Sequence, residues 1–258
     1  MFCSGCRRQT SPTAGTILHN SRVPLRSWFL AMWLACTQKT GLSAKGLQRE
    51  LGLGSYQTAW LMLQKLRQAM VRLGRERLGG SVEVDETYLG GKEKHVRGRE
   101  LVGKALVVVA VELEGRGMGR IRLRHVSDAS DPSLVGFVSD CVEPGSLVHT
   151  DGWRGYRGLK KAGYRHRVTH TAGDSRLAAE EFAHVHLVAS LLKRWLAATH
   201  QGKVGKVHLQ RYLDEFTFRF NRRKSRHVGK IFHRLVEQLV LRKALTYRDI
   251  TAKHPSSN

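Results

Sequence analysis

The chain has 258 residues, of which 44 are Lys or Arg and 21 are Asp or Glu, giving a formal net charge of +23 at pH 7. This excess of positive charge favours nucleic acid as the partner, although ribosomal or membrane-surface binding would give a similar charge. The most apolar early run, WFLAMWLAC, is about half the length that a bilayer requires, and we find no signal peptide. We therefore expect a cytoplasmic protein, associated with the nucleoid if its partner is DNA.

The first 22 residues contain two of the four cysteines, Cys3 and Cys6, in a C-x-x-C pair. A structural zinc ion takes four ligands, and no second pair of this kind follows. Either the site is incomplete or the pair is simply two thiols. We interpret residues 1–22 as the remnant of a zinc ribbon whose first half lies upstream, and we do not expect this chain alone to hold zinc.

Residues 23–78 show the apolar spacing of helices. Ser43 is positioned to cap one helix, and GLG at 52–54 separates it from a longer helix that Ser55 would cap. A helix, a glycine turn and a longer helix are typical of a helix-turn-helix, although an ordinary helical hairpin has the same pattern. The expected DNA contacts are Ser55, Tyr56, Gln57 and Thr58 at base edges, and Lys65 and Arg67 near phosphates.

From Ser81 the apolar period changes to two, which indicates strands. GKALVVVAVEL at 103–113 is typical of a central strand buried on both faces, and GRIRLRHV alternates basic and apolar residues. A helix begins near Asp131, and a short strand follows at 146–150. The order of three strands, helix, strand, helix, strand and helix predicts a mixed α/β sheet.

Three acids lie in the first strand of this basic chain, within VEVDETYLGGK at 82–92. Glu83 and Asp85 share one face of that strand, and Asp151 follows the strand at 146–150. If these strands are neighbours, Asp85 and Asp151 can meet, and a bound cation would offset their repulsion. Carboxylates suit Mg²⁺ or Mn²⁺, so the sequence predicts a metal site there. Glu83 is equally consistent with supporting that site and with a surface or salt-bridged role.

We expect a third ligand from the helix EEFAHVHLVASLLKRWLAATH at 180–200. Its apolar face contains Val185, Val188, Ala189, Leu192 and Leu196. His186, Ser190 and Lys193 fall together on another face, since seven residues span about two helical turns.

VEVDETYLGGK, VHTDGWRGY and HVHLVASLLKRWLAATHQG…HLQRYLDEFTFRFNRR together closely resemble bacterial insertion-sequence transposases of the ISXO type, over about residues 2–223. The resemblance implies a zinc ribbon, a helix-turn-helix and a DDE-type catalytic domain. The expected fold is therefore an α/β, RNase-H-like mixed sheet flanked by helices, preceded by a small all-helical region. The expected domains are a zinc-ribbon remnant at 1–22, a helix-turn-helix region at 23–78, a catalytic domain at 79–226, and a C-terminal helix with a disordered tail at 227–258.

The resemblance implies Asp85, Asp151 and His186 as ligands of two Mg²⁺ or Mn²⁺ ions, and Lys193 as a phosphate contact. The family usually has Glu at the third position, or Asn in relatives, where this chain has His186. A neutral imidazole can also ligate a metal. The alternative third ligands are Glu180, Glu181 and Glu215.

Two basic clusters, WRGYRGLKKAGYRHR at 153–167 and FRFNRRKSR at 218–226, predict contacts with the DNA backbone. The residues expected to make them are Arg154, Arg157, Arg222 and Arg223. Trp153 and Tyr156 could stack on an unpaired base, but we favour core packing for both. The expected partner is double-stranded DNA, at element ends and target, and the resemblance implies a homo-oligomer in a synaptic complex.

These features predict a DNA transposase that cuts and joins the ends of its element with an Asp/Asp/His site. The alternatives are a DNA-binding regulator, a related nuclease and a decayed transposase copy. A regulator leaves Asp85, Asp151 and the 35-residue step to His186 unexplained. Only the resemblance favours joining over cleavage alone.

Overall fold

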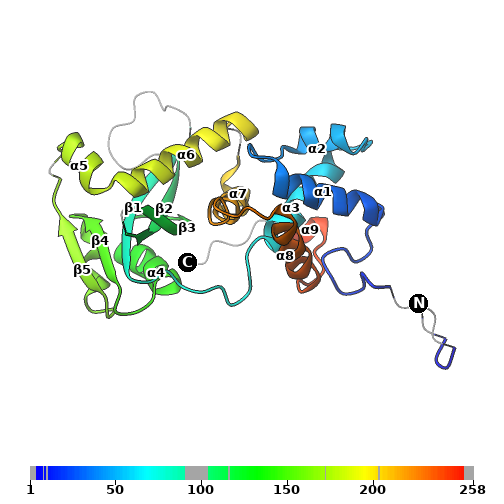
Figure 1. Cartoon of the computed structure of the whole chain (residues 1–258), viewed down its shortest axis with the longest axis horizontal. Helices are drawn as coiled ribbons and strands as arrows, with labels where there is room; N and C mark the ends of the chain where they lie inside the picture. The colour runs from blue at the N-terminus through cyan, green and yellow to red at the C-terminus, as the bar shows by residue number, and fades with distance from the viewer. Residues whose placement is uncertain are drawn as a thin grey trace. The chain divides into compact units, whose positions relative to one another are not determined.

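The computed structural model describes residues 4–7, 9, 11–90, 104–115, 117–171, 173–202 and 204–252 (Figure 1). The chain divides into two compact units, one from Met1–Leu73 with Lys224–Asn258 and the other from Gly74–Arg223. We name them the helical unit and the sheet unit. None of the helices in the described part of the chain combines the length and apolar composition that a membrane crossing requires.

The helical unit is built from both ends of the chain. Its helices in the described residues are α1 (Leu25–Thr37), α2 (Ala44–Glu50), α3 (Tyr56–Ala69), α8 (Val228–Val240) and α9 (Tyr247–Thr251). The aromatic ring of Phe232 on α8 packs against α1, with its centroid 6.3 Å from that of Phe29 and 5.8 Å from that of Trp33. Helix α8 also buries Leu235 and Leu239, so it contributes to the core of the unit that the N-terminal residues begin.

Helices α2 and α3 lie where the helix-turn-helix was expected. Ser43 caps α2 as predicted, because its side chain accepts a hydrogen bond from the Gly46 N–H at 3.0 Å. Ser55 precedes α3, but its side chain makes no capping hydrogen bond there. At the start of α3, Tyr56 and Gln57 are exposed and Thr58 is half-buried. Contact of this helix start with DNA stays a prediction.

Lys65 and Arg67 correct the predicted DNA interface. Both side chains are buried within the fold. The Lys65 ammonium donates a 3.0 Å hydrogen bond to the Ile17 carbonyl, and desolvation lowers the pKa of Lys65. These residues therefore stabilise the protein interior, and the expectation that they lie near phosphates is wrong.

Three further expectations concern the chain ends. Cys3 lies outside the described residues, and Cys6 is an exposed free cysteine, so the zinc-ribbon interpretation stays a prediction. Residues 253–258 of the expected disordered tail also lie outside the described residues. Within the segment at 227–258, where one helix and a tail were expected, the structure has a second helix, α9, which ends at Thr251. Thr246 and Asp249 form a capping box at its start, which was not predicted.

The sheet unit contains a mixed sheet with strand order β3-β2-β1-β4-β5. Its strands are β1 (Ser81–Leu89), β2 (Ala105–Glu114), β3 (Gly117–Val126), β4 (Leu147–Asp151) and β5 (Arg165–Thr169). The first three pair antiparallel, whereas β4 pairs parallel with β1 and β5 parallel with β4. This is the RNase-H-like mixed sheet that was expected.

Helices cover both faces of this sheet, with α6 along one face and α4 against the other (Figure 1). The helical segments of the unit are α4 (Asp131–Cys141), the 3-10 helix η1 (Arg154–Leu159), α5 (Ser175–Glu181), α6 (Ala183–His200) and α7 (Lys206–Phe220). Along β2, Val107 and Val109 pack towards α6 and α7, while Val108 and Ala110 pack towards α4. The predicted central strand is thus buried on both faces, as its apolar run indicated.

Partly buried histidines make the stability of this unit depend on pH. Burial is the main cause that lowers the pKa values of His125 and His166 below 6.5. The His166 ring shares a 2.9 Å hydrogen bond with the Thr150 hydroxyl. Because the unfolded chain binds a proton first as the pH falls, these residues contribute stability that is present above pH 6.5 and is lost below it.

We therefore expect the free energy of unfolding to fall between about pH 6.5 and 5, and to fall less steeply in His166→Gln. Denaturant titrations across this range measure the effect. His170→Gln, which replaces an exposed histidine of the same unit, is the control and should keep the wild-type slope. An unchanged slope in His166→Gln would contradict the assignment.

Candidate active site

Strand pairing places the two predicted metal-binding aspartates on neighbouring strands in the interior of the sheet. β4 runs parallel beside β1, with Glu83 opposite His149. Asp85 and Asp151 each lie two residues beyond this pair, so both side chains fall on the same face as Glu83 and His149. Adjacent strands lie about 4.8 Å apart, so the two carboxylates belong to one neighbourhood. The condition set by the sequence analysis, that the two strands are neighbours, is met.

Helix α6 crosses this end of β1 and brings His186 over Asp85. The His186 Nε2 atom lies 3.3 Å from Asp85 Oδ2. The hydrogen bond to this carboxylate is the main cause that raises the pKa of His186, although burial and Lys193 oppose it. A hollow of about 410 Å³, which we name the acidic hollow, is lined by Asp85, Glu86, Thr87, Val109, Val185, His186, Ala189, Ser190 and Lys193. It brings together three of the four residues predicted to be catalytic.

Asp151, the fourth, does not line the acidic hollow. Its Oδ1 atom accepts a 3.0 Å hydrogen bond from the Trp153 N–H, within the turn that follows β4. Its charge nevertheless acts on the same region, because burial and the charges of Glu86, Asp85 and Asp151 raise the pKa of Tyr156 well above 10.0. The three carboxylates therefore lie near one neutral phenol.

Tyr156 is completely buried, which settles its role as core packing and excludes stacking on a base. Its hydroxyl donates a 2.9 Å hydrogen bond to Glu86 Oε2. Glu86 also lines the acidic hollow, which the sequence analysis missed because strand alternation assigns it to the face opposite Asp85. The sequence offered one signal that Glu86 could belong to the site, namely its position directly after Asp85.

In the described part of the chain, no group of three or more His, Cys, Asp or Glu side chains is arranged to hold a metal ion. Asp85 and His186 instead contact each other directly. Two carboxylates and an imidazole are nevertheless a chemically suitable donor set for Mn²⁺, and the carboxylates for Mg²⁺. The residues present therefore fit a divalent cation by their chemistry.

The alternative third ligands are less well placed than His186. Glu180 and Glu181 form ion pairs with arginines. Glu215 is buried on α7. None of these three glutamates lines the acidic hollow, whereas His186 does.

Glu83 fixes the start of α6 to β1. Its side chain is almost fully buried, at 5% exposure. Its Oε2 accepts a 3.1 Å hydrogen bond from the Val185 N–H, and its Oε1 accepts one of 2.7 Å from His184 Nδ1. Val185 lies in the first turn of α6, where backbone N–H groups lack helical acceptors and the helix dipole favours a negative charge. Glu83 therefore positions His186 above Asp85.

The four arginines of the sheet unit that were expected to contact phosphates differ in their exposure and in their contacts within the protein. Arg154 and Arg157 are exposed on η1. The guanidinium groups of Arg222 and Arg223 lie 3.9 Å and 4.0 Å from the centroids of phenylalanine rings of α7. Arg223 also donates a 3.1 Å hydrogen bond to the Gly119 carbonyl. Arg223 thus helps to hold the end of α7 against β3, whereas Arg222 packs on α7 itself. Contact of all four arginines with DNA stays a prediction.

The order of the sheet and the acids at adjoining strands define an RNase-H-like domain. Residues 77–221 match the family described as the ISXO2-like transposase domain. The chain is also 32% identical over 236 residues to "Uncharacterized protein in transposable element ISH50" from Halobacterium salinarum, which covers 84% of this chain and 77% of that protein. The chain therefore belongs to the ISXO2-like transposases, and it is a DNA transposase of the insertion-sequence type.

Solved structures give more distant matches. The simian T-cell lymphotropic virus intasome in complex with the PP2A regulatory subunit B56 gamma has a chain that is 13% identical, with a TM-score of 0.38 and coverage of 72% of this chain and 70% of that one. The Mos1 strand transfer complex has a chain that is 15% identical, with a TM-score of 0.31 and coverage of 86% and 80%. The family assignment depends on the sequence matches.

The Glu83 contact predicts a measurable effect of a near-isosteric substitution. Glu83→Gln places an amide NH₂ where both neighbours are donors, which should cost about 1–3 kcal/mol of unfolding free energy. Hydrogen exchange at the Val185 amide should also accelerate, because the first turn of α6 loses its charged acceptor. Glu180→Gln, which removes an exposed charge on α5, is the matched control. Unchanged exchange at the start of α6 would show that Glu83 does not fix the helix.

Proposed function

We propose that this transposase cuts and joins DNA at the ends of its element, using Asp85, Asp151 and His186 as ligands of divalent cations. The observation that carries the proposal is the 3.3 Å contact between Asp85 and His186 in a hollow that also contains Lys193. The alignment of Asp151 with Asp85 on the adjacent strand supports it further.

Each side chain has a separate role in this proposal. Asp85, Asp151 and His186 would hold two Mg²⁺ or Mn²⁺ ions, which activate the attacking oxygen and stabilise the leaving oxygen when bound. His186 releases its proton before its nitrogen serves as a ligand. Lys193, exposed on α6, contacts the phosphate beside the scissile bond. Glu83 keeps His186 in position beside Asp85 by holding the start of α6.

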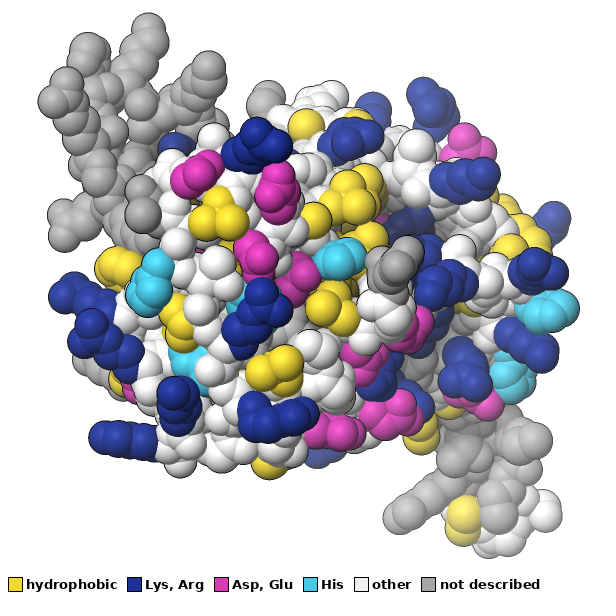
Figure 2. Space-filling view, turned by 60° about the vertical axis from the view of Figure 1, so that its left-hand side comes forward, with side chains coloured by type: hydrophobic (Ala, Val, Ile, Leu, Met, Phe, Trp, Pro, Cys, Tyr) yellow, Lys and Arg dark blue, Asp and Glu magenta, His cyan; other side chains and the backbone are white. Residues whose placement is uncertain are grey.

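The remaining parts of the proposal concern DNA and assembly. Lys and Arg side chains are spread over the face shown in Figure 2, with Asp and Glu side chains between them. We propose that these cations bind the backbone of double-stranded DNA, and that Ser55, Tyr56 and Gln57 at the start of α3 contact base edges. Joining two element ends requires a synaptic complex, for which we propose a homo-oligomer.

A strand-transfer assay tests the proposal. It combines the full chain, a duplex carrying the element's end, a supercoiled target, and Mg²⁺ or Mn²⁺. Asp85→Asn and Asp151→Asn should each reduce joined product by about 1,000-fold, since each removes several kcal/mol of transition-state stabilisation. DNA affinity should change by less than about two-fold, because the phosphate contacts remain.

Glu180→Gln is the control for loss of one carboxylate outside the site and should join DNA at the wild-type rate. Normal cutting by either aspartate variant would contradict the metal site. Metal-dependent nicking without joining would instead identify a nuclease. Tight binding with neither reaction would favour a DNA-binding regulator or a decayed copy.

The identity of the third ligand gives a second test. Imidazole suits softer divalent ions, whereas carboxylate suits Mg²⁺. His186→Glu should therefore lower the ratio of the Mn²⁺-supported joining rate to the Mg²⁺-supported rate. His186→Ala should lose activity with both metals. Full activity of His186→Ala would show that another residue completes the site.

A further inference from the structure

Two more hollows continue from the acidic hollow. The second, of about 870 Å³, shares Lys193 and two β1 residues with it and lies at the ends of β1 and β2; we name it the middle hollow. The third, of about 1000 Å³, shares Tyr88, Lys104 and Lys206 with the middle hollow; we name it the aromatic hollow. The three hollows thus form one path around the end of the sheet.

The path joins opposite faces of the sheet. The acidic hollow lies against Val109 and Val185, which belong to the core beneath α6. The aromatic hollow lies against Leu106 and Val126, which belong to the core beneath α4. The path therefore begins beside Asp85 on one face of the sheet and ends beside Trp153 on the other.

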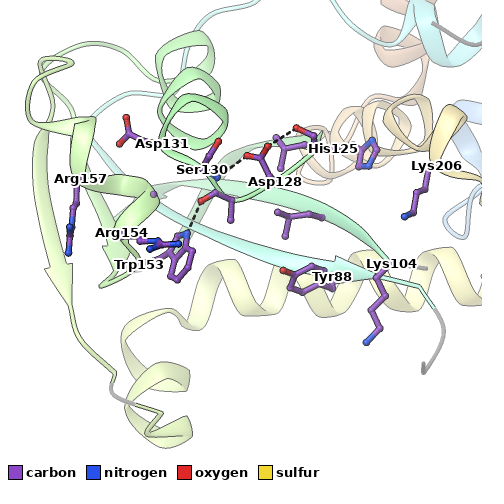
Figure 3. A pocket seen from close by; sticks show the side chains of 15 residues that line it. Tyr88, Lys104, His125, Asp128, Ser130, Asp131, Trp153, Arg154, Arg157 and Lys206 are labelled. Carbon is purple, nitrogen blue, oxygen red and sulfur yellow. Dashed lines mark hydrogen bonds between the residues drawn. The ribbon is translucent and has the colours of Figure 1, made fainter. Parts of the chain in front are cut away.

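The aromatic hollow combines flat rings with cations. Trp153 and Tyr88 lie in its lining, and Figure 3 shows Arg154 beside Trp153, with Lys104 and Lys206 farther along the hollow. The Trp153 ring is held in place, because its Nε1 donates a 2.8 Å hydrogen bond to the Ala129 carbonyl. The Arg154 guanidinium lies 5.4 Å from the centroid of the Trp153 ring.

The acids in the lining are engaged by their own loop. Asp128 accepts hydrogen bonds from the Ser130 N–H at 2.9 Å and the Ser133 hydroxyl at 2.8 Å. Asp131 accepts one of 2.8 Å from the Gly158 N–H. The cationic side chains of the lining, Lys104, Arg154, Arg157 and Lys206, are the groups whose charge is opposite to that of an anionic ligand.

An unpaired DNA strand has the chemistry that matches this path. Each nucleotide offers a flat base for an aromatic ring and a phosphate for a cation, the combination by which proteins bind single strands. A duplex is stiff over about 50 nm and cannot turn around the end of a sheet, whereas a single strand can. The aromatic hollow is also within the size range of small-ligand pockets, about 300–1,000 Å³.

We propose that the path bounded by Lys193, Lys104, Lys206 and Trp153 binds an unpaired stretch of DNA that continues from the scissile phosphate. One base lies against Trp153, and the lysines follow the phosphates. This inference rests on the proposed function, because the strand enters from the hollow that contains Asp85. It adds a single-strand site on the face of the sheet opposite α6.

The test compares two DNA probes with the full chain, a blunt duplex and the same duplex with a thymidine tail of a few nucleotides. Wild type should bind the tailed duplex about ten-fold more tightly, the effect of stacking about one base. Trp153→Leu should remove this preference while leaving the affinity for the blunt duplex unchanged. Lys104→Gln should also reduce the preference for the tailed duplex. This second variant keeps the proposal testable if Trp153→Leu does not fold.

Arg176→Gln is the matched charge control, because Arg176 is 89% exposed on α5 and lies outside the path. It should keep the wild-type preference for the tail. Equal binding of both probes by wild type would overturn the proposal, as would an intact preference in Trp153→Leu. If the protein joins DNA but shows no preference for the tail, only the single-strand path is refuted. If it prefers the tail but does not join DNA, only the proposed function is refuted.

Discussion

The buried carboxylate of Glu83 fixes the geometry on which the candidate site depends. It lies two positions before Asp85 on β1 and accepts hydrogen bonds from the first turn of α6. Because a helix is rigid over its first turns, this anchor determines where His186 and, two turns later, Lys193 meet the sheet. Burying a charge is costly unless it is hydrogen-bonded, so the anchor persists only with α6 in this position.

In the structure, the charges of the acids on β1 are offset by different groups from those that the sequence led us to expect. We expected a bound metal ion to offset the charge of the acids at the site, and left open whether Glu83 supports that site or is salt-bridged. Each acid instead has a partner that can supply a proton: Glu83 and Asp85 contact histidines of α6, and Glu86 accepts from Tyr156. A cation bound at this site would compete with protons for the same oxygens.

Periodicity predicted most of the fold, because alternating and continuous apolar runs report burial directly. It placed Asp85 within one strand, Asp151 at the end of another and His186 on the polar face of its helix, but only the structure showed that the two strands are neighbours. It failed for Lys65, since a single sequence does not reveal that the Ile17 carbonyl lies within reach of its ammonium. The aromatic hollow was also unpredictable, because its lining comes from β1, β2, β3, η1 and the start of α7, segments far apart in the chain.

The helical unit is closed by the last helices of the chain, so the sheet unit is an insertion within it. Phe232 of α8 completes the aromatic packing around Phe29 and Trp33. Two chain segments, rather than one, therefore connect the helical unit to the sheet unit. A copy truncated after Arg223 would consequently lose an essential wall of its N-terminal unit rather than a dispensable tail.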